Sequence, residues 1–421
     1  MSEYVQTRST SVDVSELSLS KQQCESRLAS IQELEKSASV VNEFRGLLDS
    51  SDSIVAFRAL EVLIQIASVS NEHLTRVCQN LFDINKRIHH LLNVSKDILS
   101  QMNCVELLTD LVRHEHGYQF LKQNGHLNDL AKHLSRDISA DPFASLMTPA
   151  IVKMFAVIAR ARSREINESY PVYFRYLFAS ALDEDVINSQ LNINLALETF
   201  IFLFEANTFK FYLHENFRGD LVRLIQRLVW LLKNCINDKI KANSFICVAF
   251  IISADPELLH GEQSDARLMS STCAPKDSRW YSLAHDLFSI LCAQIADDAL
   301  LARMLGYAKK PFVDLRLASH FYLKALAHTH FGLRSLFRPS KSVSQKELID
   351  GYLLNRSTEL EKDGMESKYE LIKLIVANFT HLSADLVDEL VGEENLNRMS
   401  LFIKQGPIYS VSESSVAFES S

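Results

Sequence analysis

The stretch NCVELLTDLVRHEHGYQFLKQNGHLNDLAKHL, residues 103–134, has apolar residues at helical spacing and is interrupted by two glycines. Apolar residues recur every three or four positions before Gly117, between Gly117 and Gly125, and after Gly125, which is the period of an α-helix. Glycine tolerates a positive φ and is common where one helix ends and the next begins. The stretch therefore predicts three helices joined by tight turns at Gly117 and Gly125.

The same pattern returns elsewhere in the chain. Leu121 aligns with Leu213, 92 residues later, when YQFLKQN (118–124) is set beside KFYLHEN (210–216). In the same way LVRHEHGYQFL (111–121) aligns with LAHTHFGLRSL (326–336), so that Gly117 matches Gly332, 215 residues later. These offsets are about two and about five units of 43 to 46 residues, the length of armadillo and HEAT repeats. The sequence therefore predicts an all-α, armadillo/HEAT-like α-solenoid.

The composition of the whole chain agrees with this fold. Glycine and proline number only 11 and 8 in 421 residues, which is few turn formers for a globular protein. Helical periodicity is clear from Ile54 onward, with almost no strand alternation. We expect a flexible N-terminal arm over residues 1–20, a helical repeat domain over 21–404 and a flexible C-terminal tail over 405–421. The polar stretches 255–279, 338–345 and 356–368 are expected to be surface loops.

Charge and cysteine content narrow the partners and the compartment. The 52 acidic and 44 basic residues are mixed along the chain and give a formal charge of −8, so nucleic acid is not expected as a partner. The seven cysteines are scattered without a C-x-x-C pair, which indicates reduced thiols in a cytoplasmic or nuclear protein. The N-terminus has no apolar signal region, and the longest apolar run, FICVAFII (245–252), is too short to cross a membrane.

Four histidines within residues 113–134 raise the question of a metal site. His114 and His116 are two residues apart and would point to different sides of a helix, whereas an H-E-x-x-H site needs an i, i+4 pair. A second pair, His328 and His330, lies at the equivalent junction, which favours a structural role near helix ends. No phosphate-binding glycine loop and no G-x-S-x-G motif occurs in the sequence. We expect no enzyme activity, no cofactor and no bound metal.

A helical repeat protein does offer a long concave surface, which the long helix of each unit lines. In the helix expected over 96–114, apolar residues such as Val105 and Leu108 face the core, and a polar stripe lies opposite. Similar stripes occur on helices before and after it. We expect the concave face to bind a protein partner through Arg58, Glu61, Gln65, Asn103, Glu106, Asp110, Arg113, Asn194, Glu198, Arg316, His320 and Lys324.

Several stretches together resemble one family, the 26S proteasome non-ATPase regulatory subunit 5. The match runs in the same order from about residue 54 to 411 and includes LVRHEHGYQFLKQNGHL (111–127), DPFASLMTPAIVKMFAVIA (141–159), YPVYFRYLF (170–178), PFVDLRLASHFYLKALA (311–327), KYELIKLI (368–375) and LNRMSLFIKQGPIY (396–409). The resemblance implies a chaperone for assembly of the proteasome base. Such a chaperone binds the C-terminal domain of one AAA+ ATPase, regulatory subunit 7, within base assembly intermediates and leaves before the mature 26S particle forms. In this chain fewer repeats precede Ile54 than in the family, and the stretch 255–279 is longer.

A second hypothesis is an armadillo-type peptide-binding adaptor or scaffold, as in nuclear transport. Such adaptors hold extended peptides with a ladder of asparagines and tryptophans on the concave helices. The equivalent positions here carry Gln65, Asp110, Phe202 and Ala325, and the chain has only two tryptophans. The sequence therefore favours the assembly chaperone over the adaptor.

Overall fold

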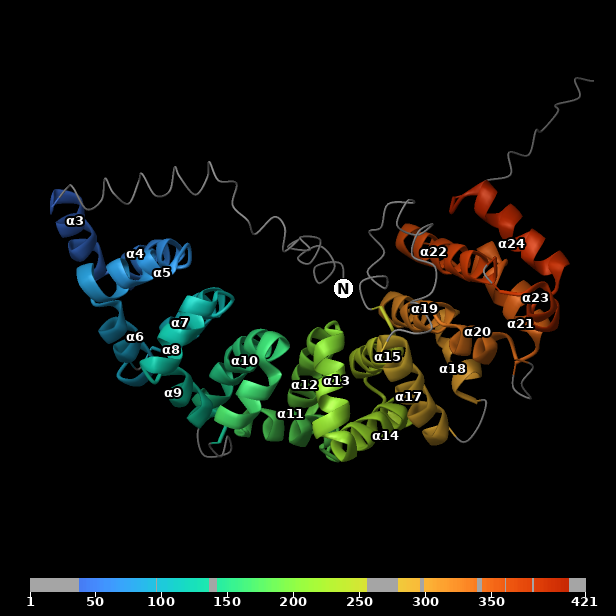
Figure 1. The fold of residues 1–421 in the computed structure, drawn as a ribbon, viewed down its shortest axis with the longest axis horizontal. Coiled ribbons are helices and arrows are strands. Elements are labelled where there is room, and N and C mark those ends of the chain that lie inside the picture. The colour runs from blue at the N-terminus through green and yellow to red at the C-terminus, as the bar shows by residue number, and fades with distance from the viewer. Residues whose placement is uncertain are drawn as a thin grey trace, which may run out of the picture. The chain divides into compact units, whose positions relative to one another are not determined.

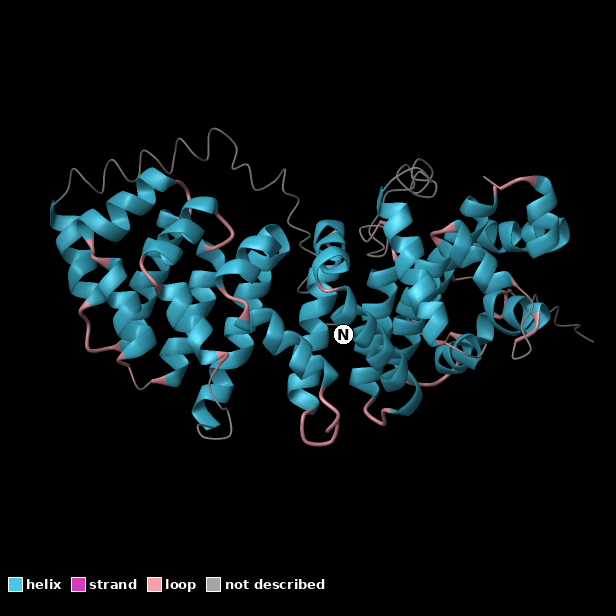
Figure 2. Cartoon of the chain, turned by 60° about the horizontal axis from the view of Figure 1, so that its bottom comes forward, coloured by secondary structure: helices cyan, strands magenta, loops and turns pink. Residues whose placement is uncertain are grey.

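The computed structural model describes residues 38–95, 97–135, 142–255, 279–295, 299–338, 343–359, 361–380 and 382–408. Every regular element in these ranges is helical, without a strand (Figures 1 and 2), which confirms the predicted all-α class. The chain divides into two compact units between Leu177 and Phe178. The expected N-terminal arm, most of the stretch 255–279 and the end of the expected tail lie outside the described residues.

The first unit is a series of helices in which two or more shorter elements separate successive long helices. Its long helices form a row, because α7 packs against α4 on one side and against α10 on the other. The elements are α3 (Ala38–Leu48), α4 (Ser53–Ala67), α5 (Asn71–Leu74) with the π-helical turn η1 (Thr75–Leu81), α6 (Ile84–Asn93), α7 (Ile98–Leu111), α8 (Glu115–Gln123), α9 (His126–His133), α10 (Pro142–Ser169) and the beginning of α11 (Val172–Leu182).

Helices α4 and α7 begin in the same way, 45 residues apart. Asp52 caps α4 by accepting a hydrogen bond from the Ile54 amide at 2.9 Å, and Asp97 caps α7 by accepting one from the Leu99 amide at 3.0 Å. In each case the aspartate amide donates to the hydroxyl of a serine two residues earlier, at 3.1 Å. An aspartate at this position satisfies amides that the first helical turn leaves open. These two long helices therefore begin with the same capping pattern.

The junction over residues 103–134 forms three helices, as the sequence predicts, but its two glycines have different roles. Gly125 has a φ of +80° and joins α8 to α9. Gly117 lies inside α8 without a positive φ, so the predicted turn at this residue is wrong. A Cβ atom at Gly117 would overlap the carbonyl oxygen of Leu111, and one at Gly332 would overlap that of Leu326. Glycine is needed here because two helices approach closely.

Helix α10 consists of a long and a short helix that meet at a kink. The backbone of Arg162 leaves the helical region, with φ −133° and ψ 48°. The guanidinium of Arg162 lies over the Tyr118 ring, 4.8 Å from its centroid, and forms an ion pair with Glu115. These contacts tie the kink to α8, so the chain turns from one repeat to the next without a loop.

The second unit continues the pattern with a row formed by α12, α15, α19 and α22, each packed against the next. Helix α22 begins within the stretch 356–368, so the second half of that predicted loop is helical. The elements are the end of α11, α12 (Gln190–Phe204), α13 (Asn207–Asn216), α14 (Arg218–Asn234), α15 (Asp238–Ile252), α17 (Arg279–Gln294), α18 (Ala299–Ala308), α19 (Val313–Ala327), α20 (His330–Phe337), α21 (Gln345–Leu348) with the π-helical turn η4 (Ile349–Leu353), the 3-10 turn η5 (Arg356–Thr358), α22 (Lys362–Phe379), α23 (Ala384–Leu390) and α24 (Glu393–Gln405).

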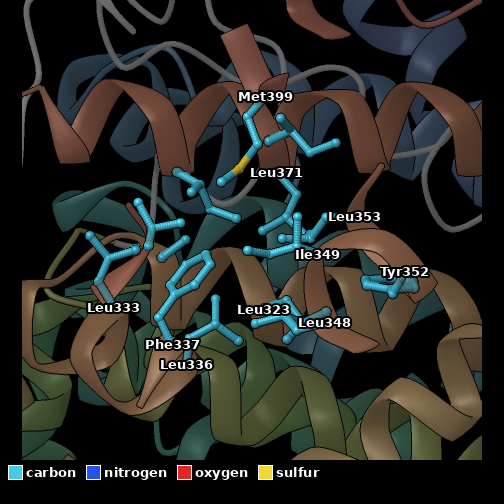
Figure 3. Close-up of a cluster of buried hydrophobic side chains, with 14 of the residues drawn as sticks. Leu323, Leu333, Leu336, Phe337, Leu348, Ile349, Tyr352, Leu353, Leu371 and Met399 are labelled. Atoms are coloured by element: carbon cyan, nitrogen blue, oxygen red, sulfur yellow. The ribbon is translucent and has the colours of Figure 1, made fainter. Parts of the chain in front are cut away.

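A buried hydrophobic cluster holds the C-terminal helices of this unit together. It joins side chains of α18 to α24, among them Leu323, Phe337, Leu371 and Met399 (Figure 3). Arg356 closes the far end, because its guanidinium donates to the Gly406 carbonyl at 2.9 Å and covers the Phe402 ring at 3.8 Å. Helix α24 is thereby part of the core.

Candidate protein-binding surface

Two polar stripes lie on neighbouring long helices of the first unit. Each is on the side of its helix opposite the buried residues, which are Leu60, Leu63 and Ile64 in α4 and Val105 and Leu108 in α7. Because α4 packs against α7, the stripes form adjoining rows, and their members recur at the 45-residue offset. The row on α4 is Arg58, Glu61 and Gln65, and the row on α7 is Asn103, Glu106 and Asp110, followed by Arg113 beyond the helix end.

Among the described residues, two short-range ion pairs at least partly exposed to solvent link charges within these rows. Arg58 Nη1 lies 2.6 Å from Glu61 Oε2, and Arg113 Nε lies 3.5 Å from Asp110 Oδ1. Glu106, Asp110 and Arg113 are all exposed. Exposed ion pairs contribute roughly 0 to 1 kcal/mol, so these side chains can exchange their present partners for those of a bound protein at little cost.

The predicted stripe on α12 is half-buried and bonded to the next long helix. The amide of Asn243 on α15 donates to Asn194 Oδ1 at 3.2 Å, and Lys239 Nζ lies 3.0 Å from Glu198 Oε1. The spacing of polar residues did not identify Asn243 or Lys239. Asn243 lies 49 residues after Asn194 and Lys239 lies 41 residues after Glu198, so no single repeat offset locates both partners.

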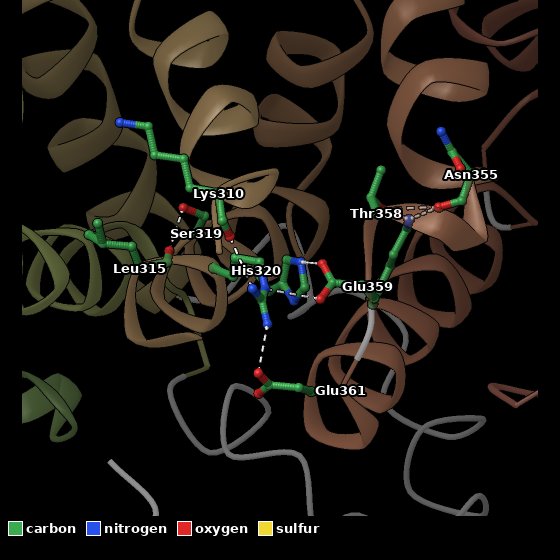
Figure 4. A network of polar contacts seen from close by, with 10 residues as sticks. Lys310, Leu315, Ser319, His320, Asn355, Thr358, Glu359 and Glu361 are labelled. Carbon is green, nitrogen blue, oxygen red and sulfur yellow. Dashed lines mark hydrogen bonds and ion pairs between the residues drawn. The ribbon is translucent and has the colours of Figure 1, made fainter. Parts of the chain in front are cut away.

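The predicted stripe on α19 is buried rather than open. Arg316, His320 and Lys324 are 6%, 0% and 8% exposed. Arg316 Nε lies 3.3 Å from Glu359 Oε2, and His320 Nε2 lies 3.1 Å from Glu359 Oε1 (Figure 4). Glu359 is itself buried, and Gly364 leaves the space that its carboxylate fills. These residues tie α19 to the segment before α22, so they are not available to a partner in this structure.

Two buried lysines complete this polar region. Burial lowers the pKa of Lys324 to about 8, and Glu370 partly offsets that effect. Burial likewise lowers the pKa of Lys368 to about 8 against the opposing charge of Glu359. The ammonium of Lys368 donates to the Asn355 carbonyl at 2.5 Å and to Thr358 Oγ1 at 2.6 Å. The lysine thus organises the same loop that carries Glu359.

The histidine cluster at the first junction is structural in its contacts. The His114 and His116 rings stack with centroids 5.5 Å apart, so the expectation that they point to different sides is wrong. The reason is that His114 caps α8 with an extended backbone, at φ −97° and ψ 139°, and is not part of the helix. His116 Nε2 lies 3.2 Å from the Ala67 carbonyl oxygen at the end of α4. The described part of the chain contains no group of three His, Cys, Asp or Glu side chains suited to a metal ion.

None of the helices in the described ranges is long and apolar enough to span a membrane. Four of the cysteines, Cys78, Cys104, Cys235 and Cys247, are buried free thiols, and Cys292 is an exposed one. Cys24 and Cys273 lie outside the described residues.

Comparison with known proteins gives a family match over nearly the whole chain. A family model described as "Proteasome non-ATPase 26S subunit" matches residues 13–258 and 267–421. The chain is 24% identical to the 26S proteasome non-ATPase regulatory subunit 5 of Bos taurus and of Homo sapiens, over 91% of this chain and 67% of each relative. The Drosophila melanogaster protein of the same name is 21% identical over 87% of this chain and 63% of its own length. Among solved structures, a designed armadillo repeat protein matches 68% of this chain and 99% of its own, with 16% identity and a TM-score of 0.36.

Proposed function

This chain belongs to the proteasome non-ATPase 26S subunit family, and from that membership we propose that it is a non-enzymatic chaperone for assembly of the base of the proteasome regulatory particle. Its client is the C-terminal domain of an AAA+ ATPase subunit, regulatory subunit 7, in base assembly intermediates. It dissociates before the mature 26S particle forms. It acts in the cytoplasm and also in the nucleus.

The observation that carries this proposal is the pair of adjoining polar stripes on α4 and α7. A temporary chaperone must hold its client and later release it. Broad, polar interfaces suit this task, because transient complexes bury less apolar surface than permanent ones and differ mainly in how fast they dissociate. The stripes offer both signs of charge on a row of packed helices, with weak internal pairs.

The adaptor hypothesis is less well supported by the side chains of the second unit. The Asn243 side-chain nitrogen donates to Asn194 Oδ1, so one donor and one acceptor of this pair are already engaged. Ala325 is buried in α19, and the partly exposed Trp230 lies on α14, outside the row of long helices. Of the four equivalent positions, only Phe202 carries an aromatic ring, and that residue is half-buried on α12.

The proposal is tested by binding of the full chain to the purified C-terminal domain of regulatory subunit 7. Reversing two charges, in the variant E106K/D110K, is expected to weaken binding by about tenfold or more, because close opposite charges at an interface often contribute more than 1 kcal/mol. The melting temperature should hardly change, since exposed substitutions usually alter stability by about 0.5 kcal/mol or less. Isothermal titration calorimetry and thermal melts measure the two effects.

The matched control is E43K/E168K, which makes the same charge change at two exposed acids outside the stripes. It is expected to bind as the wild type does. Equal weakening by both variants would mean that only net charge matters, and unchanged binding by E106K/D110K would move the site elsewhere. Stoichiometric retention of the chain in purified 26S particles would contradict the chaperone role itself.

A further inference from the structure

The second unit displays apolar side chains that its own core does not use. Ile187, Leu191 and Ile236 are 81%, 85% and 93% exposed, and they are the three most exposed large apolar side chains among the described residues. A single exposed hydrophobic residue is ordinary on a protein surface, whereas a group of them marks an interaction site. The question is therefore whether these three lie together.

One hydrogen bond joins the turns that carry Leu191 and Ile236. Asn237 Nδ2 donates to Gln190 Oε1 at 2.8 Å, which joins the turn before α15 to the first turn of α12. Leu191 follows Gln190 in the chain, and Ile236 precedes Asn237. Both side chains therefore stand at the N-terminal ends of two helices that pack against each other.

The third, Ile187, is held at the tip of an ordered loop. Asp183 accepts hydrogen bonds from the Asp185 amide at 2.9 Å and from Ser189 Oγ at 2.6 Å. Asp185 accepts from both the backbone and the side-chain amide of Asn188, at 3.1 and 2.7 Å. The loop is thus fixed by its polar groups while its isoleucine remains in solvent. The hydrogen bonds therefore set the shape of the loop, and Ile187 stays exposed.

A tryptophan is linked to the same loop through Arg227. Arg227 on α14 donates to the Asp183 carbonyl oxygen, and its guanidinium lies 4.5 Å from the centroid of the Trp230 ring. The indole is 44% exposed. We name Ile187, Leu191, Trp230 and Ile236 the apolar patch.

The charges around the apolar patch are mostly negative and decide what can cover it. Glu184 and Asp185 are exposed beside it. The next charges are already paired, because Asp238 Oδ1 lies 3.6 Å from Lys241 Nζ and Lys239 Nζ lies 3.0 Å from Glu198 Oε1. A second copy of this chain on the patch would bring these acids against their own copies, which like-charge repulsion disfavours. An anionic membrane surface is disfavoured for the same reason.

We propose that the apolar patch docks a partner-protein segment whose apolar side chains are flanked by lysine or arginine. The apolar residues would cover the patch, and the cations would face its acidic rim. This inference goes beyond the proposed chaperone function and does not depend on which ATPase subunit is the client. It assigns a second surface, distinct from the polar stripes of the first unit.

The first experiment uses a short helical peptide made of leucine and lysine as a defined probe of the full-length chain. The variant I187S/L191S/I236S is expected to bind this peptide about tenfold or more weakly than the wild type, because it removes the apolar area that the peptide would cover. The control variant L401S removes an exposed leucine of α24 outside the patch and should bind normally. Equal peptide affinity of the wild type and the triple variant overturns the proposal.

The second experiment identifies the native occupant. A photo-crosslinking amino acid is placed at residue 236, or at residue 401 as the control, and the crosslinked peptide is sequenced after irradiation in extract of cells that express the chain. The expected product is one apolar peptide with flanking lysine or arginine, which in synthetic form binds the wild type and loses about tenfold affinity for the triple variant. A crosslink no stronger than that of the control, a peptide without basic flanks, or a crosslink to a second copy of this chain overturns the proposal.

Discussion

At the scale of single residues, Glu359 explains why part of the predicted protein-binding surface is buried. Its carboxylate lies within 3.3 Å of Arg316 and 3.1 Å of His320, both on α19. Burial lowers the pKa of His320, and the nearby Glu359 opposes that shift. A polar stripe at helical spacing looks the same in sequence whether it meets solvent or a buried counter-charge. Here the counter-charge comes from a segment about 40 residues further along the chain, beyond the reach of local patterns.

Replacing Glu359 with glutamine is expected to destabilise the protein by about 3 kcal/mol or more. The change keeps the size of the side chain but leaves Arg316 buried without its nearest negative charge, and breaking a buried pair from one side typically costs about 3 to 5 kcal/mol. The variant E361Q is the control, because Glu361 is 52% exposed and lies 3.7 Å from the same arginine. Urea unfolding measures both, and equal stability of E359Q and E361Q would show that the buried pair contributes little.

A second residue, His328, is expected to make the stability of the protein depend on pH. His328 is buried, and neither ring nitrogen has a hydrogen-bond partner among the described residues. Burial lowers the pKa of His328 from 6.5 to about 4. Between these values the unfolded chain binds more protons than the folded one, so the free energy of unfolding falls as the pH falls, by up to about 1.4 kcal/mol per pH unit for this residue.

The variant H328L should therefore lose part of this pH dependence. At pH 7.5, where the histidine is neutral in both states, we expect its stability to stay within about 1.5 kcal/mol of the wild type, because the two side chains are similar in size. Between pH 7.5 and pH 5, the free energy of unfolding should fall less in H328L than in the wild type. Unfolding curves at several pH values test this, and parallel pH profiles for the two proteins would refute it.

At the scale of helices, the ends of the long helices are closed by polar groups from neighbouring elements. His116 reaches the Ala67 carbonyl at the end of α4, and the Asn378 amide donates to the Ala327 carbonyl at the end of α19, at 2.8 Å. Lys210 does the same for α15, where its buried ammonium donates to the Phe250 and Ser253 carbonyls. The last carbonyls of a helix have no partner inside it, so each of these helices depends on a neighbouring element, earlier or later in the chain, for this purpose.

Replacing glycine with alanine should have opposite effects on stability at two positions, because only one of them lies where two helices approach closely. The variant G117A is expected to lose about 1 to 3 kcal/mol, because a Cβ at this position overlaps the Leu111 carbonyl and one helix must move. The control G306A lies in α18 with no atom near its added methyl group, and alanine there should raise stability by up to about 1 kcal/mol. Opposite signs in urea unfolding are the expected outcome, and a neutral G117A would mean that the junction can relax.

The sequence predicts the positions of the helices but misses contacts that depend on how the helices pack. Periodicity locates the long helices, and the alignment of residues 111–121 with 326–336 correctly pairs Gly117 with Gly332. It does not reveal why glycine stands there, because overlap with a carbonyl of the preceding helix depends on how the helices pack. For the same reason the stripes on α4 and α7 could be predicted from spacing alone, whereas the bond between Asn194 and Asn243 requires the register of two helices.

At the scale of the whole molecule, the candidate surfaces are distributed over both units. The stripes on α4 and α7 belong to the first unit, and the stripe on α12 and the apolar patch belong to the second. Repeat proteins bind through many side chains on successive helices. In such an interface no single residue needs to dominate, and contributions from separate helices should accumulate.

The last prediction is that charge changes in the two units weaken client binding independently. The double variant E106K/D110K alters the first unit, and E198K alters the second by placing a lysine beside Lys239. If the client spans both stripes, each variant should weaken binding of the regulatory subunit 7 domain, and the loss in binding free energy for the triple variant should equal the sum of the two within about 0.5 kcal/mol. Calorimetric titration of the four proteins measures this sum. Wild-type affinity in E198K would exclude the stripe on α12 from the interface.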